Sequence, residues 1–270
     1  MRIIYTMIFI IISTVIVIKI NNNYSAGTQK NSIKIGVNPG ENADIMKKVK
    51  EIAARSGVNI EIIEFSDFMT PNIALDNGDI DANAFQHEKY LNNQINAKGY
   101  KIESVATTII TPMKIYSNKV QKIADIPKNA IISLPNDPTN FERALLLLEK
   151  CKLIKLKKKQ DIKSISDIAE NPKNAQFIEI DAAQVSRTLN DVNAAVINTN
   201  YAILAKIKPE NAIFSEDNIN NPYANLIVVQ SKNKDKPWVK TLVESYRNEE
   251  VKQYIKDLFP KDSSFIIPTW

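Results

Sequence analysis

The 270-residue chain contains only one cysteine, Cys151, and only one histidine, His87. A single cysteine cannot form an internal disulfide, and the chain has neither a CxxC pair nor a Cys/His cluster of the kind that binds zinc. It also lacks a glycine-rich phosphate loop and a recognisable catalytic triad. The sequence therefore favours a protein without a metal, a cofactor or covalent chemistry.

The charge of the chain is modest. The net charge is +5, and the densest basic run, Lys155–Lys159, has no interleaved aromatic residues and no glycine. This run is more typical of a solvated helix end than of a nucleic-acid surface, so we expect no nucleic-acid partner. The length and an apolar fraction of 44% indicate a folded protein with one large or two medium domains.

The N-terminus has the pattern of a targeting segment. Arg2 precedes an apolar run from Ile3 to Ile18, and a polar stretch follows. The run is shorter than the ~20 residues that span a bilayer comfortably, which favours a secretory signal. Ala26 suits a cleavage site but Tyr24 does not, so an uncleaved anchor in contact with the inner membrane stays open. We expect residues 1–31 to be signal or anchor, and the remainder to be exported, either periplasmic or associated with the extracytoplasmic face of the membrane.

From Ser32 onward the pattern alternates between strand and helix. Residues 33–37 and 59–65 predict strands, and apolar residues at helical spacing between them predict a helix that stops at Gly57. This order is typical of a parallel sheet with right-handed crossovers. Residues 75–85 and 191–197 both resemble the end of such a unit. We therefore expect an α/β fold in which one lobe is built twice, with binding loops at the carboxyl ends of the strands.

Two extended stretches are predicted to connect the lobes, at residues 107–116 and 221–229. Two crossings form a hinge, and a cleft between lobes is a preferred place for a small ligand. Residues 238–259 have the spacing of amphipathic helices that pack back onto the first lobe. The predicted lobes are residues 32–111 with 222–270, and residues 112–221.

The stretch 135–148 carries the clearest functional pattern. It predicts a turn over 135–138 after a strand, and then a helix capped by Thr139 or Asn140. Backbone N–H groups and the dipole at a helix N-terminus attract anions. We expect Arg143 in the first turn, where its guanidinium can meet a carboxylate with two hydrogen bonds. The alternative is a solvent-facing arginine on an ordinary helix.

Five stretches together carry a resemblance to a known family, at residues 64–72, 81–91, 135–148, 195–202 and 222–229. They resemble the methionine-binding lipoproteins of the NlpA family, in register from about Ile33 to Trp270. These proteins are substrate-binding components of ABC importers. The resemblance implies a type II periplasmic-binding-protein fold, with two α/β lobes that close over a free amino acid without catalysis. It also implies an importer permease and ATPase as partners.

The resemblance assigns roles to nine residues. The ligand carboxylate would contact Arg143 and Asn140, and side-chain oxygens of asparagines would accept from its ammonium group. Aromatic side chains would surround a thioether by sulfur–aromatic contact. The asparagines are Asn198, Asn200 and Asn225, and the aromatic residues are Phe68, Phe85, His87 and Tyr90. Plain core packing of the phenylalanines and a structural role of the histidine are the alternatives.

Two features depart from the family pattern. No cysteine follows the apolar run at the N-terminus, so a lipid anchor is not expected there, and Cys151 is predicted to be a buried small residue. Phe141 and Glu142 replace small residues before the arginine. This leaves open a methionine-containing dipeptide or another amino acid as the ligand. An enzyme on the same fold is the remaining alternative.

Overall fold

The computed structural model of the chain describes residues 32–158, 162–258 and 265–270. The predicted targeting segment, residues 1–31, lies outside this range. Among the described residues, no helix has both the length and the apolar character needed to cross a membrane.

The first sheet has six strands in the order β13-β4-β12-β3-β1-β2. Their bounds are β1 (Ser32–Val37), β2 (Asn59–Glu64), β3 (Ala82–His87), β4 (Ile102–Ile110), β12 (Ala224–Gln230) and β13 (Ile267–Pro268). Strand β1 runs parallel to β2 and β3, whereas β12 is antiparallel to both β3 and β4. The first two strands predicted from the sequence, and their parallel pairing, are confirmed.

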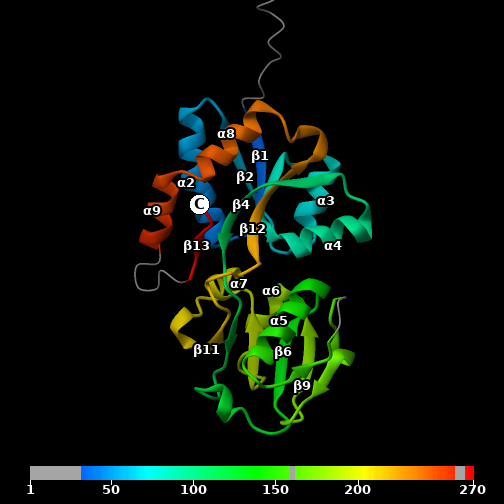
Figure 1. Cartoon of the computed structure of the whole chain (residues 1–270). Helices are drawn as coiled ribbons and strands as arrows, with labels where there is room; N and C mark the ends of the chain where they lie inside the picture. Colours follow the sequence, from blue (N-terminus) through cyan, green and yellow to red (C-terminus); the bar gives the residue numbers. More distant parts are fainter. Residues whose placement is uncertain (1–31, 159–161, 259–264) are drawn as a thin grey trace, which may run out of the picture. The chain divides into compact units, whose positions relative to one another are not determined.

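Helices cover both faces of this sheet (Figure 1). One face carries α2 (Glu41–Arg55), α8 (Pro237–Tyr246) and α9 (Glu249–Leu258), and the other carries α3 (Thr70–Asn77) and α4 (Glu88–Lys98). The apolar positions of α2 that recur at helical spacing, such as Ile45 and Val49, are fully buried against Leu242 and Tyr246. The predicted C-terminal helices therefore do pack against the first sheet.

The second sheet has five strands in the order β11-β5-β10-β6-β9. They are β5 (Lys114–Tyr116), β6 (Ile131–Pro135), β9 (Gln176–Ile180), β10 (Ala194–Ile197) and β11 (Ala212–Ser215). Helix α5 (Pro138–Lys150) packs into one apolar cluster, and α6 (Ala182–Val185) and α7 (Thr199–Leu204) pack into another. Strand β6 is parallel to β9 and β10, so this sheet repeats the arrangement of the first.

Two segments connect the sheets. Strand β4 ends at Ile110 and β5 begins at Lys114, so the single crossing strand predicted over 107–116 is interrupted at Pro112, which has no N–H for a ladder. The return runs from the end of β11 to β12. Each sheet draws all its strands from one of the two predicted lobes, which supports lobe boundaries at 111/112 and 221/222 as a proposal.

Two smaller predictions are wrong. Helix α5 ends at Lys150, and Lys155–Leu156 form β7, which pairs with β8 (Ile168–Glu170), so the basic run does not end a helix. Cys151 is half-buried because it caps the end of α5, where its Sγ contacts the Leu148 carbonyl at 3.2 Å.

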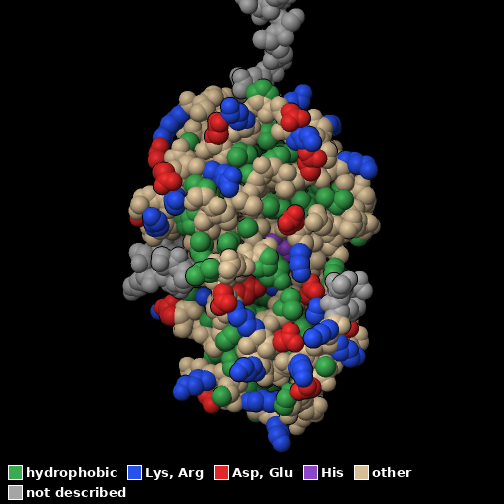
Figure 2. Space-filling model, viewed as in Figure 1, with side chains coloured by type: hydrophobic (Ala, Val, Ile, Leu, Met, Phe, Trp, Pro, Cys, Tyr) green, Lys and Arg blue, Asp and Glu red, His purple; other side chains and the backbone are tan. Residues whose placement is uncertain are grey.

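Acidic and basic side chains are intermixed on the face shown in Figure 2, in keeping with a modest, dispersed charge.

Candidate functional site

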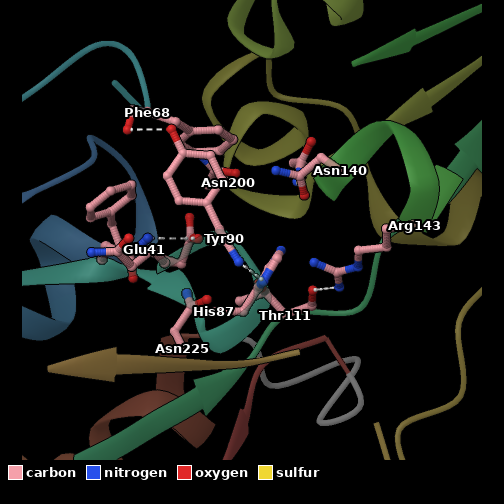
Figure 3. A pocket seen from close by; sticks show the side chains of 13 residues that line it. Glu41, Phe68, His87, Tyr90, Thr111, Asn140, Arg143, Asn200 and Asn225 are labelled. Carbon is pink, nitrogen blue, oxygen red and sulfur yellow. Dashed lines mark hydrogen bonds between the residues drawn. The ribbon is translucent and has the colours of Figure 1, made fainter. Parts of the chain in front are cut away.

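One cavity brings together side chains from both sheets (Figure 3). All nine residues singled out in the sequence lie around it: Phe68, Phe85, His87, Tyr90, Asn140, Arg143, Asn198, Asn200 and Asn225. Most come from the carboxyl ends of strands or from the first turns of helices. This is the edge at which open parallel sheets hold ligands.

Helix α5 begins two or three residues earlier than the sequence indicated. Pro138 occupies the first helical position, which suits its fixed φ and missing N–H, so the residue before it becomes the cap. Asp137, and neither Thr139 nor Asn140, is therefore the N-cap, and its Oδ1 accepts from the Asn140 backbone N–H at 2.9 Å. Its carboxylate also accepts from the Asn140 side chain at 3.0 Å, which fixes that amide at the cavity.

Arg143 lies in the second turn of α5, and not in the first as predicted, because the helix begins earlier, at Pro138. It is 3% exposed, so the solvent-facing alternative is wrong. Its Nε and Nη2 donate to Glu216 at 2.7 and 2.6 Å, and Nη2 also donates to the Thr111 carbonyl at 3.0 Å. We predicted that two hydrogen bonds from Arg143 would reach a ligand carboxylate. In the structure, two such bonds reach the carboxylate of Glu216 instead. Nη1 donates no hydrogen bond to the described residues, and it is the part of the guanidinium left for a ligand.

Glu216 fixes the position of this arginine and also forms hydrogen bonds to both segments that connect the sheets. Its Oε2 accepts from the Met113 backbone N–H at 2.8 Å and from Asn221 Nδ2 at 3.2 Å. The ring of Tyr223 lies 4.1 Å from the guanidinium carbon of Arg143. The local sequence gave no sign of this pair, because Glu216 follows the short strand β11 and is 73 residues from Arg143.

The three asparagines enter the cavity from different elements. Asn198 follows β10 and precedes α7, but its side chain forms no cap and instead donates to Asn140 Oδ1 at 2.9 Å. Asn200 is in the first turn of α7. Asn225 lies near the beginning of β12. It reaches the same edge because β12 is antiparallel and pairs Asn225 with His87.

Aromatic side chains form one wall of the cavity. The ring of Phe68 lies 6.0 Å from that of Phe85, 6.2 Å from Tyr90 and 4.9 Å from Tyr201. The Tyr90 hydroxyl donates to the Phe68 carbonyl at 2.8 Å, so its polar end is satisfied within the wall. The remaining ring faces offer an apolar surface that suits a thioether.

His87 caps helix α4. Its Nδ1 accepts from the Tyr90 backbone N–H at 3.2 Å, which leaves Nε2 at the cavity without a hydrogen-bond partner among the described residues. Burial, and then the positive charge of Arg143, lower the pKa of His87 to about 3, against an opposing contribution from the nearby Asn140. His87 is therefore neutral at physiological pH.

Comparison with known proteins places the chain in a family. The profile of the NlpA lipoprotein family matches residues 33–270. The chain belongs to the NlpA lipoprotein family. It is 40% identical over 234 residues to the D-methionine-binding lipoprotein MetQ of Escherichia coli K12, which covers 85% of this chain and 86% of that protein. It is 44% identical to outer membrane lipoprotein 3 of Mannheimia haemolytica, covering 81% and 84%.

Solved structures agree with this placement. A nutrient-binding protein from Burkholderia cenocepacia bound to methionine is 45% identical, with a TM-score of 0.85 over 88% of this chain and 100% of the other. A methionine-binding protein MetQ is 39% identical, with a TM-score of 0.84 over 89% and 98%. The fold is thus the type II periplasmic-binding-protein fold, with two α/β lobes and a ligand cleft between them.

Four residues that line the cavity of this NlpA-family chain were not predicted: Glu41, Asn42, Gln86 and Thr111. Gln86 belongs to a buried amide network, in which its Nε2 donates to Asn72 Oδ1 at 2.6 Å. Glu41 is the first residue of α2, directly after the turn at Pro39 and Gly40. Open α/β sheets bind ligands at the carboxyl ends of their strands. The turn after β1 is such an end, so this principle also predicts Glu41 as a site residue.

Proposed function

We propose that the chain is an extracytoplasmic substrate-binding protein that captures methionine and delivers it to an ABC importer. The observation that carries this proposal is a set of buried polar atoms without hydrogen-bond partners among the described residues, all on residues that line one cavity: Glu41 Oε2, His87 Nε2, Asn198 Oδ1 and Asn200 Nδ2. An unpaired buried polar atom costs about 1–3 kcal/mol. A polar ligand in the cavity removes that cost.

The cavity suits an amino acid with an apolar side chain. Arg143 Nη1 provides a donor for a carboxylate, and Asn140 at the start of α5 lines the same cavity. Asn198, Asn200 and Asn225 provide amide groups for the ammonium end of the ligand. Phe68, Phe85, His87 and Tyr90 surround the thioether. Relatives named for binding methionine support this assignment.

Export and transport follow from the same family membership. Relatives are named as lipoproteins, which supports a place on the extracytoplasmic side. A permease and an ATPase of an importer are the partners that we propose. The action is binding without catalysis. His87 supports this, because burial lowers its pKa to about 3, far below the working pH, and so makes its imidazole a poor general base. Cys151 is not among the residues that line the cavity.

Calorimetry on ligand-free protein tests the proposal. The protein is unfolded in denaturant, dialysed and refolded, because a tightly held ligand can persist through purification. We expect saturable one-to-one binding of L- or D-methionine or of glycyl-methionine, and mass spectrometry should recover the ligand unchanged. Absence of binding by all three would contradict the function, and recovery of a chemically altered product would favour the enzyme alternative.

A further inference from the structure

Glu41 is buried without a charged partner. It is 1% exposed, its Oε1 accepts a long hydrogen bond, 3.3 Å, from Asn42 Nδ2, and its own backbone N–H provides a further hydrogen bond to the carboxyl group. Its Oε2 is buried and has no hydrogen-bond partner among the described residues. A carboxylate is rarely buried unless a cation or several donors compensate it. The residue also lines the ligand cavity, so the missing partner can be a ligand.

The other buried carboxylates have such compensation. Glu142 lies 3.3 Å from Lys89 Nζ and 4.0 Å from Lys163 Nζ. Asp167 accepts from both the backbone N–H and the hydroxyl of Ser164, at 2.8 and 3.0 Å. Glu41 therefore differs from its buried counterparts in the described part of the chain.

Its place at the start of α2 does not by itself explain the burial. An acidic residue in a first helical turn is stabilised by the helix dipole even when it is exposed. Asp44 occupies the same turn and does this at the surface, where its side chain is 45% exposed and pairs with Lys47 at 2.8 Å. Glu41 is the second acidic residue of this turn, but it is buried and lines the cavity. The helix dipole alone therefore does not explain its position.

The charges around the cavity indicate what that role is. Arg143 and Glu41 are the charged residues that line it, and Glu216 already neutralises Arg143. The two lining residues lie apart in Figure 3, with His87 and Tyr90 between them. A zwitterion can therefore direct its carboxylate toward Nη1 of Arg143 and its ammonium toward the other side.

We propose that Glu41 is the anionic partner of the ligand ammonium group, beside the amides of Asn198, Asn200 and Asn225, and that it selects ligands that carry a free amino group. Its Oε2 accepts a charge-assisted hydrogen bond from the α-ammonium of methionine or from the N-terminal ammonium of a methionine-containing dipeptide. This inference rests on the proposed function and deepens it, because it names the chemical group that separates ligands from otherwise similar carboxylic acids.

Ligand binding is then coupled to a proton. Burial is the main cause that raises the pKa of Glu41 to about 8, and Asp44 adds to it. Tyr201 of α7 and Tyr246 of α8 also face Glu41, and their pKa values are raised, so both stay neutral. Below pH 8 the free protein holds Glu41 protonated, and an ammonium group favours the ionised form. Binding therefore releases a proton, and affinity increases as the pH rises from 6 toward 7.5.

The test compares Glu41→Gln with Asp44→Asn, a matched change in the same helical turn. Each is titrated with methionine, with glycyl-methionine and with 4-(methylthio)butanoic acid, which lacks the amino group. We expect Glu41→Gln to weaken the amino ligand roughly 10- to 100-fold while its binding of the amino-free acid stays within threefold of wild type. Asp44→Asn should bind like wild type. If methionine loses more affinity than glycyl-methionine, Glu41 binds the α-ammonium of a free amino acid. If glycyl-methionine loses more, Glu41 binds the N-terminal ammonium of a dipeptide.

Proton release is measured at pH 7 by calorimetry in two buffers of different ionisation enthalpy. Wild type should release a proton with the amino ligand, and Glu41→Gln should not. Methionine and glycyl-methionine binding within threefold of wild type in Glu41→Gln would overturn the assignment, as would equal losses for ligands with and without the amino group. If wild type binds none of these ligands, the proposed function fails, and the role of Glu41 fails with it.

Discussion

At Arg143, the pairing with Glu216 determines which part of the guanidinium a ligand can use. Both oxygens of Glu216 accept from Arg143, and Oε2 also accepts from the connecting segment at Met113. A cation buried in this way keeps its position only while its carboxylate partner remains. Glu216 is therefore a positioning residue, which orients Nη1 without touching the ligand itself.

Replacement of Glu216 by glutamine tests this dependence. The Glu216→Gln variant retains one acceptor but leaves Arg143 as a buried charge without a counterion. We expect the free energy of unfolding to fall by about 3 kcal/mol, because loss of one partner from a buried pair costs this much. Methionine affinity should also fall, since Nη1 is no longer held. Urea unfolding and calorimetry measure the two effects.

The neighbouring residue is the matched control. The side chain of Asp217 is 72% exposed and pairs with Lys150 at the surface. Exposed pairs contribute less than about 1 kcal/mol, so Asp217→Asn should leave stability and binding nearly unchanged. If the two variants proved equally stable, Glu216 would not have the proposed positioning role.

At the scale of elements, local patterns were sufficient for much of the fold. The spacing of apolar residues was sufficient to predict strand β1 and helix α2. Their apolar residues are buried in the core, and this pattern is visible in the sequence whichever elements pack against it. The contact between Arg143 and Glu216 did not follow, since it depends on how β11 ends relative to α5. The burial of Glu41 likewise depends on contacts made by distant elements, among them α7 and α8.

Gly36 shows how closely β1 packs against the elements that lead to the cavity. A Cβ atom at Gly36 would lie 2.6 Å from Ile80 Cδ1 and 2.9 Å from Phe65 Cε2. We expect Gly36→Ala to lower the free energy of unfolding by about 1–3 kcal/mol, the usual effect of overpacking. The additional change Ile80→Val removes the nearest atom. In urea unfolding, the double variant should be more stable than the sum of the two single effects, and simple additivity would contradict the steric explanation.

At the scale of the whole described unit, contacts join elements of the first sheet to elements of the second. Lys89 of α4 pairs with Glu142 of α5 at 3.3 Å. The Tyr201 hydroxyl of α7 donates to the Ser66 carbonyl at 3.3 Å. The rings of Phe68 and Tyr201 form a further contact between the two halves, and the residues that line the cavity also come from both. A ligand in the cavity therefore touches both halves of the fold and should stabilise them together.

Thermal unfolding in the presence of amino acids tests this selectivity. A ligand that binds only the folded state at 100 times its Kd adds about 2.7 kcal/mol of stability. For a chain of this size the melting temperature should rise by ~5–10 °C, because each kcal/mol corresponds to about 2–4 °C. We expect methionine or glycyl-methionine to produce this shift, and short polar amino acids to produce none.

Leucine and glutamine separate the contributions of shape and polarity. Leucine keeps the apolar character but branches near the aromatic wall, so its shift should be small. Glutamine has a similar length but places an amide against Phe68, Phe85 and Tyr90, where an unmet hydrogen bond costs about 1–3 kcal/mol. It should therefore shift the melting temperature least. A larger shift with glutamine than with methionine would contradict the ligand assignment. It would leave the two-lobed fold unaffected, since the fold follows from the two sheets and from similarity to solved structures.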